Sequence, residues 1–147
     1  MARPKKNRVV NNPPLYSEFK PLGLTTKLIE QVQMTLDEYE AFRLADYLGL
    51  SQDEASKEME ISRPTFTRLI EKARKKIADL IINGKFLTIE GGNIHFRKNI
   101  IQCQNCGYMF KTNFQTTLNK CPQCDSDKLI NLAGGFGHGR CCANIID

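Results

Sequence analysis

Two closely spaced pairs of cysteines constrain the fold of this chain more than any other feature. Two residues separate Cys103 from Cys106, the same spacing separates Cys121 from Cys124, and 14 residues lie between the pairs. Zn²⁺ binds four thiolates in a tetrahedron, and each C-x-x-C turn supplies two of them. The pattern therefore predicts a Cys₄ zinc site. Iron, held by four sulfurs as in rubredoxin-type modules, is the alternative metal, because ligand spacing does not separate the two.

A closed Cys₄ site has a structural role, because it leaves no coordination position open for a substrate. The predicted zinc ribbon covers residues 99–132, which are too few to bury an adequate core without help. Metal binding supplies roughly 10 kcal/mol or more and offsets that deficit.

The rest of the composition argues against a membrane, secreted or catalytic protein. No apolar run approaches the roughly 18 residues of a membrane span, and no apolar core follows the basic N-terminus as in a secretory signal. We therefore expect a cytoplasmic protein, in which six cysteines favour metal binding over disulfides. Two histidines, and no nucleophile paired with a base, predict that the chain is not an enzyme.

Helical periodicity precedes the cysteines. Thr35 and Glu38 form a capping-box pattern at the start of a first helix, which Gly49 ends. Ser51 and Glu54 repeat the pattern at the start of a short second helix. Because both helices carry their own start signals, the segment predicts two separate helices joined by a turn.

A third helix is expected over residues 63–82. Ser62 can cap it, Pro64 falls in its first turn, and Asn83 and Gly84 end it. Apolar residues recur at helical spacing and predict one buried face, formed by Phe66, Leu69, Ile70, Ala73, Ile77, Leu80 and Ile81.

Charge is segregated between these helices. Residues 36–60 hold eight acidic and two basic residues, whereas residues 63–76 hold six basic residues and one acidic residue. Three helices with a tight turn before the third indicate a helix-turn-helix, whose third helix enters the DNA major groove. Arginine suits base edges and lysine suits phosphates. The predicted DNA-binding residues are Ser62, Arg63, Thr65, Thr67, Arg68, Lys72, Lys75 and Lys76.

The stretches "MARPKK", "FKP", "TLDEYEAFRLAD" and "GLSQDEASKEMEISRPTFTRLIEKARKKIAD" resemble domain-of-unknown-function family 134, whose small prokaryotic members are predicted to bind DNA. The resemblance runs from residue 1 to about 92. It implies a helix-turn-helix similar to region four of bacterial sigma factors, with Ser62, Arg63, Thr65, Phe66 and Arg68 on the recognition helix. One departure is Glu60, which stands where such turns usually have glycine. The turn is therefore expected to carry about 1 kcal/mol of strain.

The predicted fold class is mainly α with a small β component. Residues 1–34 are expected to form a basic extended arm, because they hold four of the six prolines. Residues 35–98 are expected to form the helix-turn-helix domain, closed by a β-hairpin with strands near 86–90 and 94–98. The zinc ribbon follows, and residues 133–147 are a Gly-rich tail that contains His138, Cys141 and Cys142.

The sequence is compatible with three functions. The preferred hypothesis is a sequence-specific transcriptional regulator that binds double-stranded DNA, with Arg3, Lys5 and Lys6 of the arm able to follow the minor groove. The second is a rubredoxin-like electron-transfer or metal-responsive protein. The third is an adaptor of the transcription machinery that binds RNA polymerase. A dimer is a further expectation, because most helix-turn-helix regulators pair on two half-sites.

Overall fold

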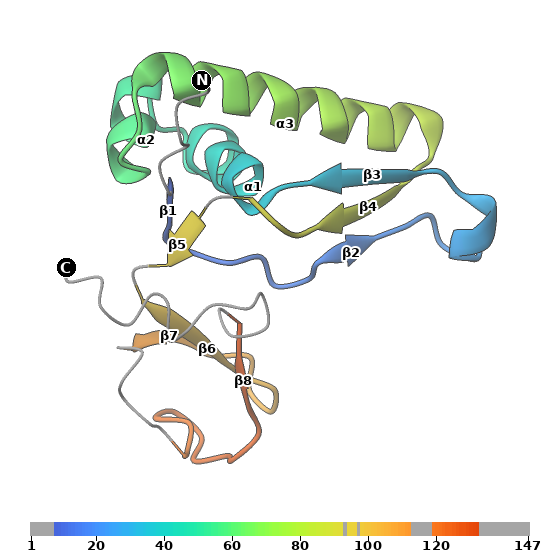
Figure 1. Cartoon of the computed structure of the whole chain (residues 1–147). Helices are drawn as coiled ribbons and strands as arrows, with labels where there is room; N and C mark the ends of the chain where they lie inside the picture. Colours follow the sequence, from blue (N-terminus) through green and yellow to red (C-terminus); the bar gives the residue numbers. More distant parts are fainter. Residues whose placement is uncertain (1–7, 93, 97, 113–118, 133–147) are drawn as a thin grey trace. The chain divides into compact units, whose positions relative to one another are not determined.

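The computed structural model describes residues 8–92, 94–96, 98–112 and 119–132 (Figure 1). The chain divides into two compact units. The first contains Met1–Val10 and Pro14–Ile94, and the second contains Asn11–Pro13 and His95–Asp147. The second unit therefore begins before the predicted boundary at residue 99. The basic residues Arg3, Lys5 and Lys6 and the tail residues His138, Cys141 and Cys142 lie outside the described residues.

The three predicted helices are all present in the first unit. α1 (Leu36–Phe42) continues into a π-helical turn, η2 (Arg43–Tyr47), and α2 (Gln52–Glu58) and α3 (Arg63–Asn83) follow. Thr35 and Ser51 accept hydrogen bonds from the backbone amides of Glu38 and Glu54, whose side chains bond back to the cap residues. Both predicted capping boxes are thus confirmed.

The three helices share one apolar core. α1 and η2 contribute Ala41 and Leu44, α2 contributes Ala55, and its C-cap residue Met59 completes that side. α3 contributes the larger side chains, namely Phe66, Leu69 and Ile70. Because the face of α3 opposite this core is left to solvent, the position of the core determines which side chains α3 can present to a partner.

The turn between α2 and α3 has the strained geometry that the sequence predicts. Glu60 has a φ of 55°, in the left-handed region. The backbone amide of Ile61 donates a 3.0 Å hydrogen bond to the Ser56 carbonyl and closes the turn. Ser62 caps α3, and Gly84 ends it with a φ of 60°.

Residues 8–34 are not the arm that the prolines predict. They form β1 (Arg8–Val10), β2 (Glu18–Phe19), the short 3₁₀ helix η1 (Thr26–Leu28) and β3 (Gln31–Met34). In β3 the buried Val32 and Met34 alternate with exposed glutamines. This period of two gives the strand a core-facing side, so the segment belongs to the folded unit.

The predicted hairpin is wrong, although both of its strands exist as β4 (Phe86–Ile89) and β5 (Ile94–Phe96). β4 lies between β2, which is antiparallel to it, and β3, which is parallel to it. Both edges of β4 are therefore occupied, and β5 pairs with β1 instead. The glycine turn between the two strands bonds to the start of α1, because the Leu36 amide donates to the Gly91 carbonyl at 3.0 Å.

The second unit contains a three-stranded sheet. β6 (Asn99–Cys103) is the central strand, with β7 (Met109–Thr112) and β8 (Leu129–Asn131) antiparallel on its two sides. With this sheet and the strands of the first unit, the chain has mixed helices and strands and is not clearly mainly α. In the described part of the chain, no helix is both long and apolar enough to cross a membrane.

Candidate metal centre and nucleic-acid interface

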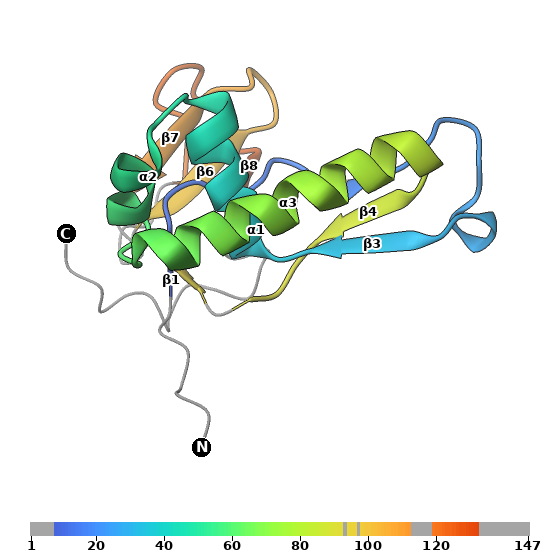
Figure 2. The same cartoon turned by 90° about the horizontal axis from the view of Figure 1, so that it is seen from above.

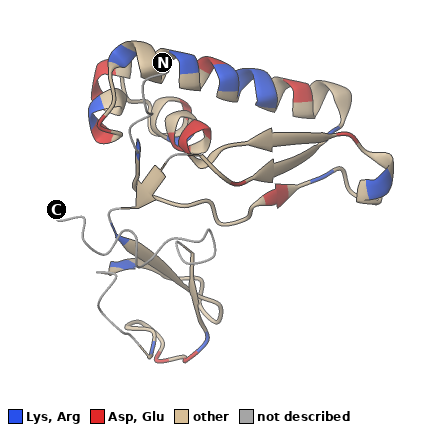
Figure 3. Ribbon diagram, in the orientation of Figure 1, with Lys and Arg blue, Asp and Glu red and all other residues tan. Residues whose placement is uncertain are grey.

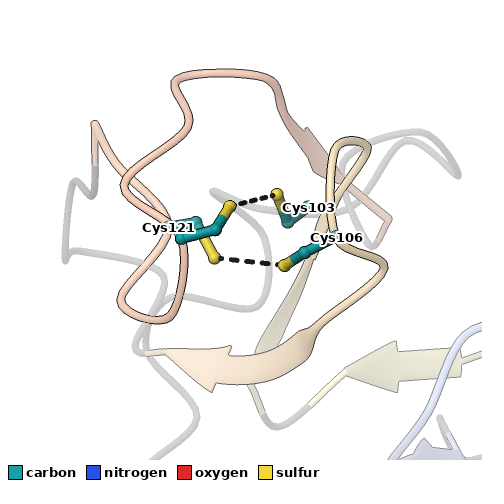
Figure 4. A group of neighbouring side chains, drawn as sticks. Cys103, Cys106 and Cys121 are labelled. Atoms are coloured by element: carbon teal, nitrogen blue, oxygen red, sulfur yellow. Dashed lines mark hydrogen bonds between the residues drawn. The ribbon is translucent and has the colours of Figure 1, made fainter.

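The four predicted cysteine ligands lie together in the second unit, where all four sulfur atoms are within 4.8 Å of one another. Figure 4 shows the side chains of Cys103, Cys106 and Cys121 converging on one point. The Sγ atoms of Cys103 and Cys124 are 3.6 Å apart, and those of Cys106 and Cys121 are 3.7 Å apart. Each contact thus joins the two motifs.

These distances fit a tetrahedral metal ion. Four thiolates at about 2.3 Å from one ion place their sulfurs about 3.8 Å apart. A disulfide needs about 2.05 Å, which is far shorter than either contact. The four cysteines can therefore hold one metal ion, and an Fe–thiolate site has the same donor set.

Two matching turns position the sulfurs. In each turn the first cysteine accepts a backbone bond from the fourth residue after it: Gly107 donates to the Cys103 carbonyl and Asp125 to the Cys121 carbonyl, both at 2.9 Å. Those two residues also share a left-handed backbone, with φ of 80° at Gly107 and 66° at Asp125. Glycine suits this position, and Asp is among the few other residues that adopt it.

Electrostatics in the cluster favours one thiolate and disfavours a second. The backbone amide of Cys106 donates to the Cys103 sulfur and, with that of Asn105, lowers the pKa of the Cys103 thiol to about 6. The Tyr108 amide favours the Cys106 thiolate, but desolvation and the neighbouring sulfurs outweigh it and raise the pKa of Cys106 to about 12. A compensating cation would favour ionisation of Cys106 beside the Cys103 thiolate.

The predicted DNA-binding residues fall into two groups on α3. In the first group, side chains have partners within the protein. Ser62 is bonded to Thr65, and the Thr67 hydroxyl donates to the side-chain oxygen of Gln52. Arg63 lies 3.5 Å from Asp53, with both side chains exposed.

Lys76, which is predicted to contact a phosphate, also belongs to the group with partners. Its Nζ atom lies 2.6 Å from Oε1 of Glu38, a carboxylate that is 5% exposed. On the other flank of α3, the Arg74 guanidinium donates to both carboxylate oxygens of Asp46, at 2.8 and 3.0 Å. Its hydrogen bond holds the pKa of Asp46 below the usual range.

The second group is a line of exposed cations, Arg68, Lys72 and Lys75, which we call the basic stripe. Their spacing of four and then three residues places them on one face of the helix. Phe66, Ile70 and Ala73 are buried on the opposite side. Among the described residues, no acidic side chain forms an ion pair with the stripe.

Figure 3 shows blue segments along α3, and red segments on α1 and α2. Figure 2 shows α3 running along β3 and β4, so the strands and α1 support the helix on its buried side. Charge segregation in the sequence suggests that the acidic residues form a face of their own, but in the structure they do not. Asp46, Glu38 and Asp53 instead neutralise the cations on the flanks and at the start of α3.

Sequence reasoning missed two features of these sites. The Asp125 turn could have been found by aligning the two C-x-x-C motifs, because Asp125 and Gly107 hold the same position after each first cysteine. The Arg74–Asp46 pair has no such signal, since its partners are 28 positions apart in the sequence.

Comparison with known proteins supports a family relationship over most of the chain. Residues 1–97 match the family described as "Protein of unknown function DUF134". A UPF0251 protein of Chloroherpeton thalassium is 45% identical over 143 residues, covering 95% of both chains. One of Halothermothrix orenii is 42% identical over 132 residues, covering 87% of this chain and 98% of the relative. No solved structure matches the chain.

Proposed function

Because the chain belongs to the family of proteins of unknown function DUF134, we propose a function from its own residues: it binds double-stranded DNA through the basic stripe and regulates transcription. The cysteine cluster, in this proposal, holds a structural zinc ion. The role is binding rather than catalysis, and it follows from α3 rather than from the family description.

The main support for the proposal is the division of the cations on α3 into those with salt-bridge partners and those of the basic stripe. Of six basic side chains between residues 63 and 76, three form salt bridges, and the three of the stripe form none with the described residues. A helix face that contacts only water gains no stability when like charges lie in one line. A polyanion that meets the helix along that line gains from every charge on it.

The dimensions of the stripe suit the major groove. Arg68 and Lys75 are seven residues apart, or about 10 Å along the helix axis. The major groove is about 12 Å wide and admits one helix. Arg68 lies nearer the start of α3, where a groove-bound helix contacts base edges, and Lys75 lies where such a helix approaches a phosphate.

Zinc in this proposal holds the second unit together. With Cys103, Cys106, Cys121 and Cys124 as ligands, the ion would join the two turns across the sheet and leave no open position for a substrate. The ion supplies folding free energy and charge compensation for the thiolates.

The test is selection of bound duplexes from a random library, followed by binding of Arg68→Ala and Lys75→Ala across a salt series. Loss of a base-reading arginine costs about 1–3 kcal/mol and relaxes one position of the consensus. Loss of a phosphate-binding lysine weakens all duplexes alike and reduces the salt slope by about one.

Two outcomes would count against the proposal in different ways. If Arg68→Ala weakens the consensus and a scrambled duplex equally, the docking of α3 is wrong. If neither variant changes DNA binding, the stripe is a solvated surface, and affinity for RNA polymerase without affinity for duplex would favour the adaptor.

A further inference from the structure

An exposed aliphatic surface lies where the C-terminal end of α3 meets the loop that carries η1. Leu24 is 48% exposed, Leu28 81%, Ile81 71% and Ile82 78%. Both views show η1 and the end of α3 at the same extremity of the first unit (Figures 1 and 2). We call these four residues the tip surface.

The tip surface is a departure from the predicted buried face of α3. Burial along the helix ends at Ala73, Ile77 and Leu80 are half-buried, and Ile81 is exposed. Leu24 and Leu28 line a hollow of about 480 Å³ with Ile29, Glu30 and residues 83–85. Ile82 lines a second hollow of about 470 Å³ on the neighbouring surface of α3, with residues 75, 76, 78 and 79. Exposed aliphatic side chains gathered around a hollow are typical of protein–protein contact sites.

The charges around these hollows have both signs, unlike the basic stripe. Lys85 lies 2.9 Å from Asp79 and 3.3 Å from Glu30, whose side chain is 83% exposed. Lys27 in η1 is also exposed. A two-fold interface brings one surface against itself, so each exposed lysine of one copy can meet an exposed carboxylate of the other.

We propose that the tip surface is the interface through which two copies of this chain form a symmetric dimer. Covering the four side chains would remove roughly 350 Å² of aliphatic surface per copy, at about 30 Å² per carbon. With the polar share of an ordinary interface, this becomes about 600 Å² per copy. Two copies then bury about 1,200 Å², the lower end of the range for specific interfaces.

The basic stripe gives a second reason for a partner copy, and this reason rests on the proposed function. One copy offers the three cations of the stripe, which form no salt bridge with the described residues, and affinity for DNA rises with each further cation that meets it. Two copies offer six. Ile82 lies ten residues beyond Lys72, about 15 Å along the axis, so Arg68 and Lys72 stay free when the tip is covered, whereas Lys75 shares a hollow with Ile82.

The experiment measures the mass of the full-length, metal-loaded protein by sedimentation equilibrium without DNA, over roughly 1–100 μM. We expect a monomer–dimer equilibrium. Ile82→Glu and Leu28→Glu should each raise the dissociation constant at least tenfold, because each places a carboxylate in an aliphatic interface. Both side chains are largely exposed, so the melting temperature of the monomer should not change. Tyr47→Glu, at an 82% exposed position in η2, is the matched control and should dimerise like wild type.

A wild-type protein that stays monomeric at 100 μM would overturn the inference, as would a dimer that neither tip variant weakens. DNA binding, measured separately, tells the two proposals apart. A monomer that binds duplex DNA leaves the proposed function intact and removes the dimer. If the protein forms a dimer that depends on Ile82 but binds no DNA, the proposed interface stands and the proposed function in transcription is wrong.

Discussion

The ammonium group of Lys76 lies 2.6 Å from Oε1 of Glu38, and the same oxygen accepts the backbone amide of Thr35 at 2.9 Å. One carboxylate therefore completes the capping box of α1 and anchors α3 to it. The charge of Lys76 is therefore already compensated by a carboxylate of the protein. The relationship separates Lys76 from its neighbour Lys75, which is exposed, and it yields the first prediction.

Lys76→Met should destabilise the first unit, whereas Lys75→Met should not. Removing Lys76 leaves a carboxylate that is 5% exposed without its cation, at a cost of about 1–3 kcal/mol. Lys75 has an exposed side chain, so its loss should change stability by less than about 0.5 kcal/mol. Denaturant unfolding measures the first effect, and the salt dependence of duplex binding should fall only for Lys75→Met. Equal effects of the two variants on both measurements would contradict the pairing.

Asp46→Asn should strengthen binding to any duplex. The substitution removes the carboxylate that holds the Arg74 guanidinium at 2.8 Å and adds one free cation beside the basic stripe. The slope of log affinity against log salt should steepen by about one, with no change in the selected consensus. Asp53→Asn, which releases Arg63, is a second variant of the same kind. An unchanged slope in both would mean that DNA does not approach this face of α3.

Cys103→Ser should abolish metal binding and unfold the second unit while leaving the helices folded. The wild type should contain about one zinc per chain, measured by elemental analysis of protein purified without added metal. Helical circular dichroism should persist, because the helical core has no residue in the cysteine cluster. Cys142→Ser, outside the described residues, is the control and should keep the metal. If the purified protein instead contains one iron per chain and shows a visible absorption band, the zinc assignment is wrong and the electron-transfer function is favoured.

Gly92→Ala should cost more stability than Gly91→Ala. Both residues have positive φ, 103° and 78°, so both variants bear backbone strain of about 1–2 kcal/mol. Only at Gly92 would the added Cβ lie 2.9 Å from Oδ1 of Asp37. That carboxylate cannot move freely, because Arg8 holds its other oxygen at 2.6 Å. Denaturant unfolding gives the free energy of unfolding of each variant, and the difference between the two variants measures the clash. If both variants lose the same free energy of unfolding, Asp37 can move aside.

Local features could be predicted from the sequence because each depends on neighbours along the chain. The capping boxes at Thr35 and Ser51 satisfy amides three residues away, and Gly84 ends α3 through its own φ. The four cysteines are similar, since two short turns and one metal chemistry require that spacing. The strained φ of Glu60 likewise followed from its place in a three-helix pattern.

Only the tertiary structure decided which partners distant segments choose. β3 and β2 take both edges of β4, so β5 pairs elsewhere and the hairpin does not form. α1 and η2 place Glu38 and Asp46 beside Lys76 and Arg74. Arg68, Lys72 and Lys75 form no salt bridge with the described residues. Periodicity assigns a side chain to a face of its own helix. It cannot say which charge packs against that face, because the partner arrives from a segment whose position depends on the whole core.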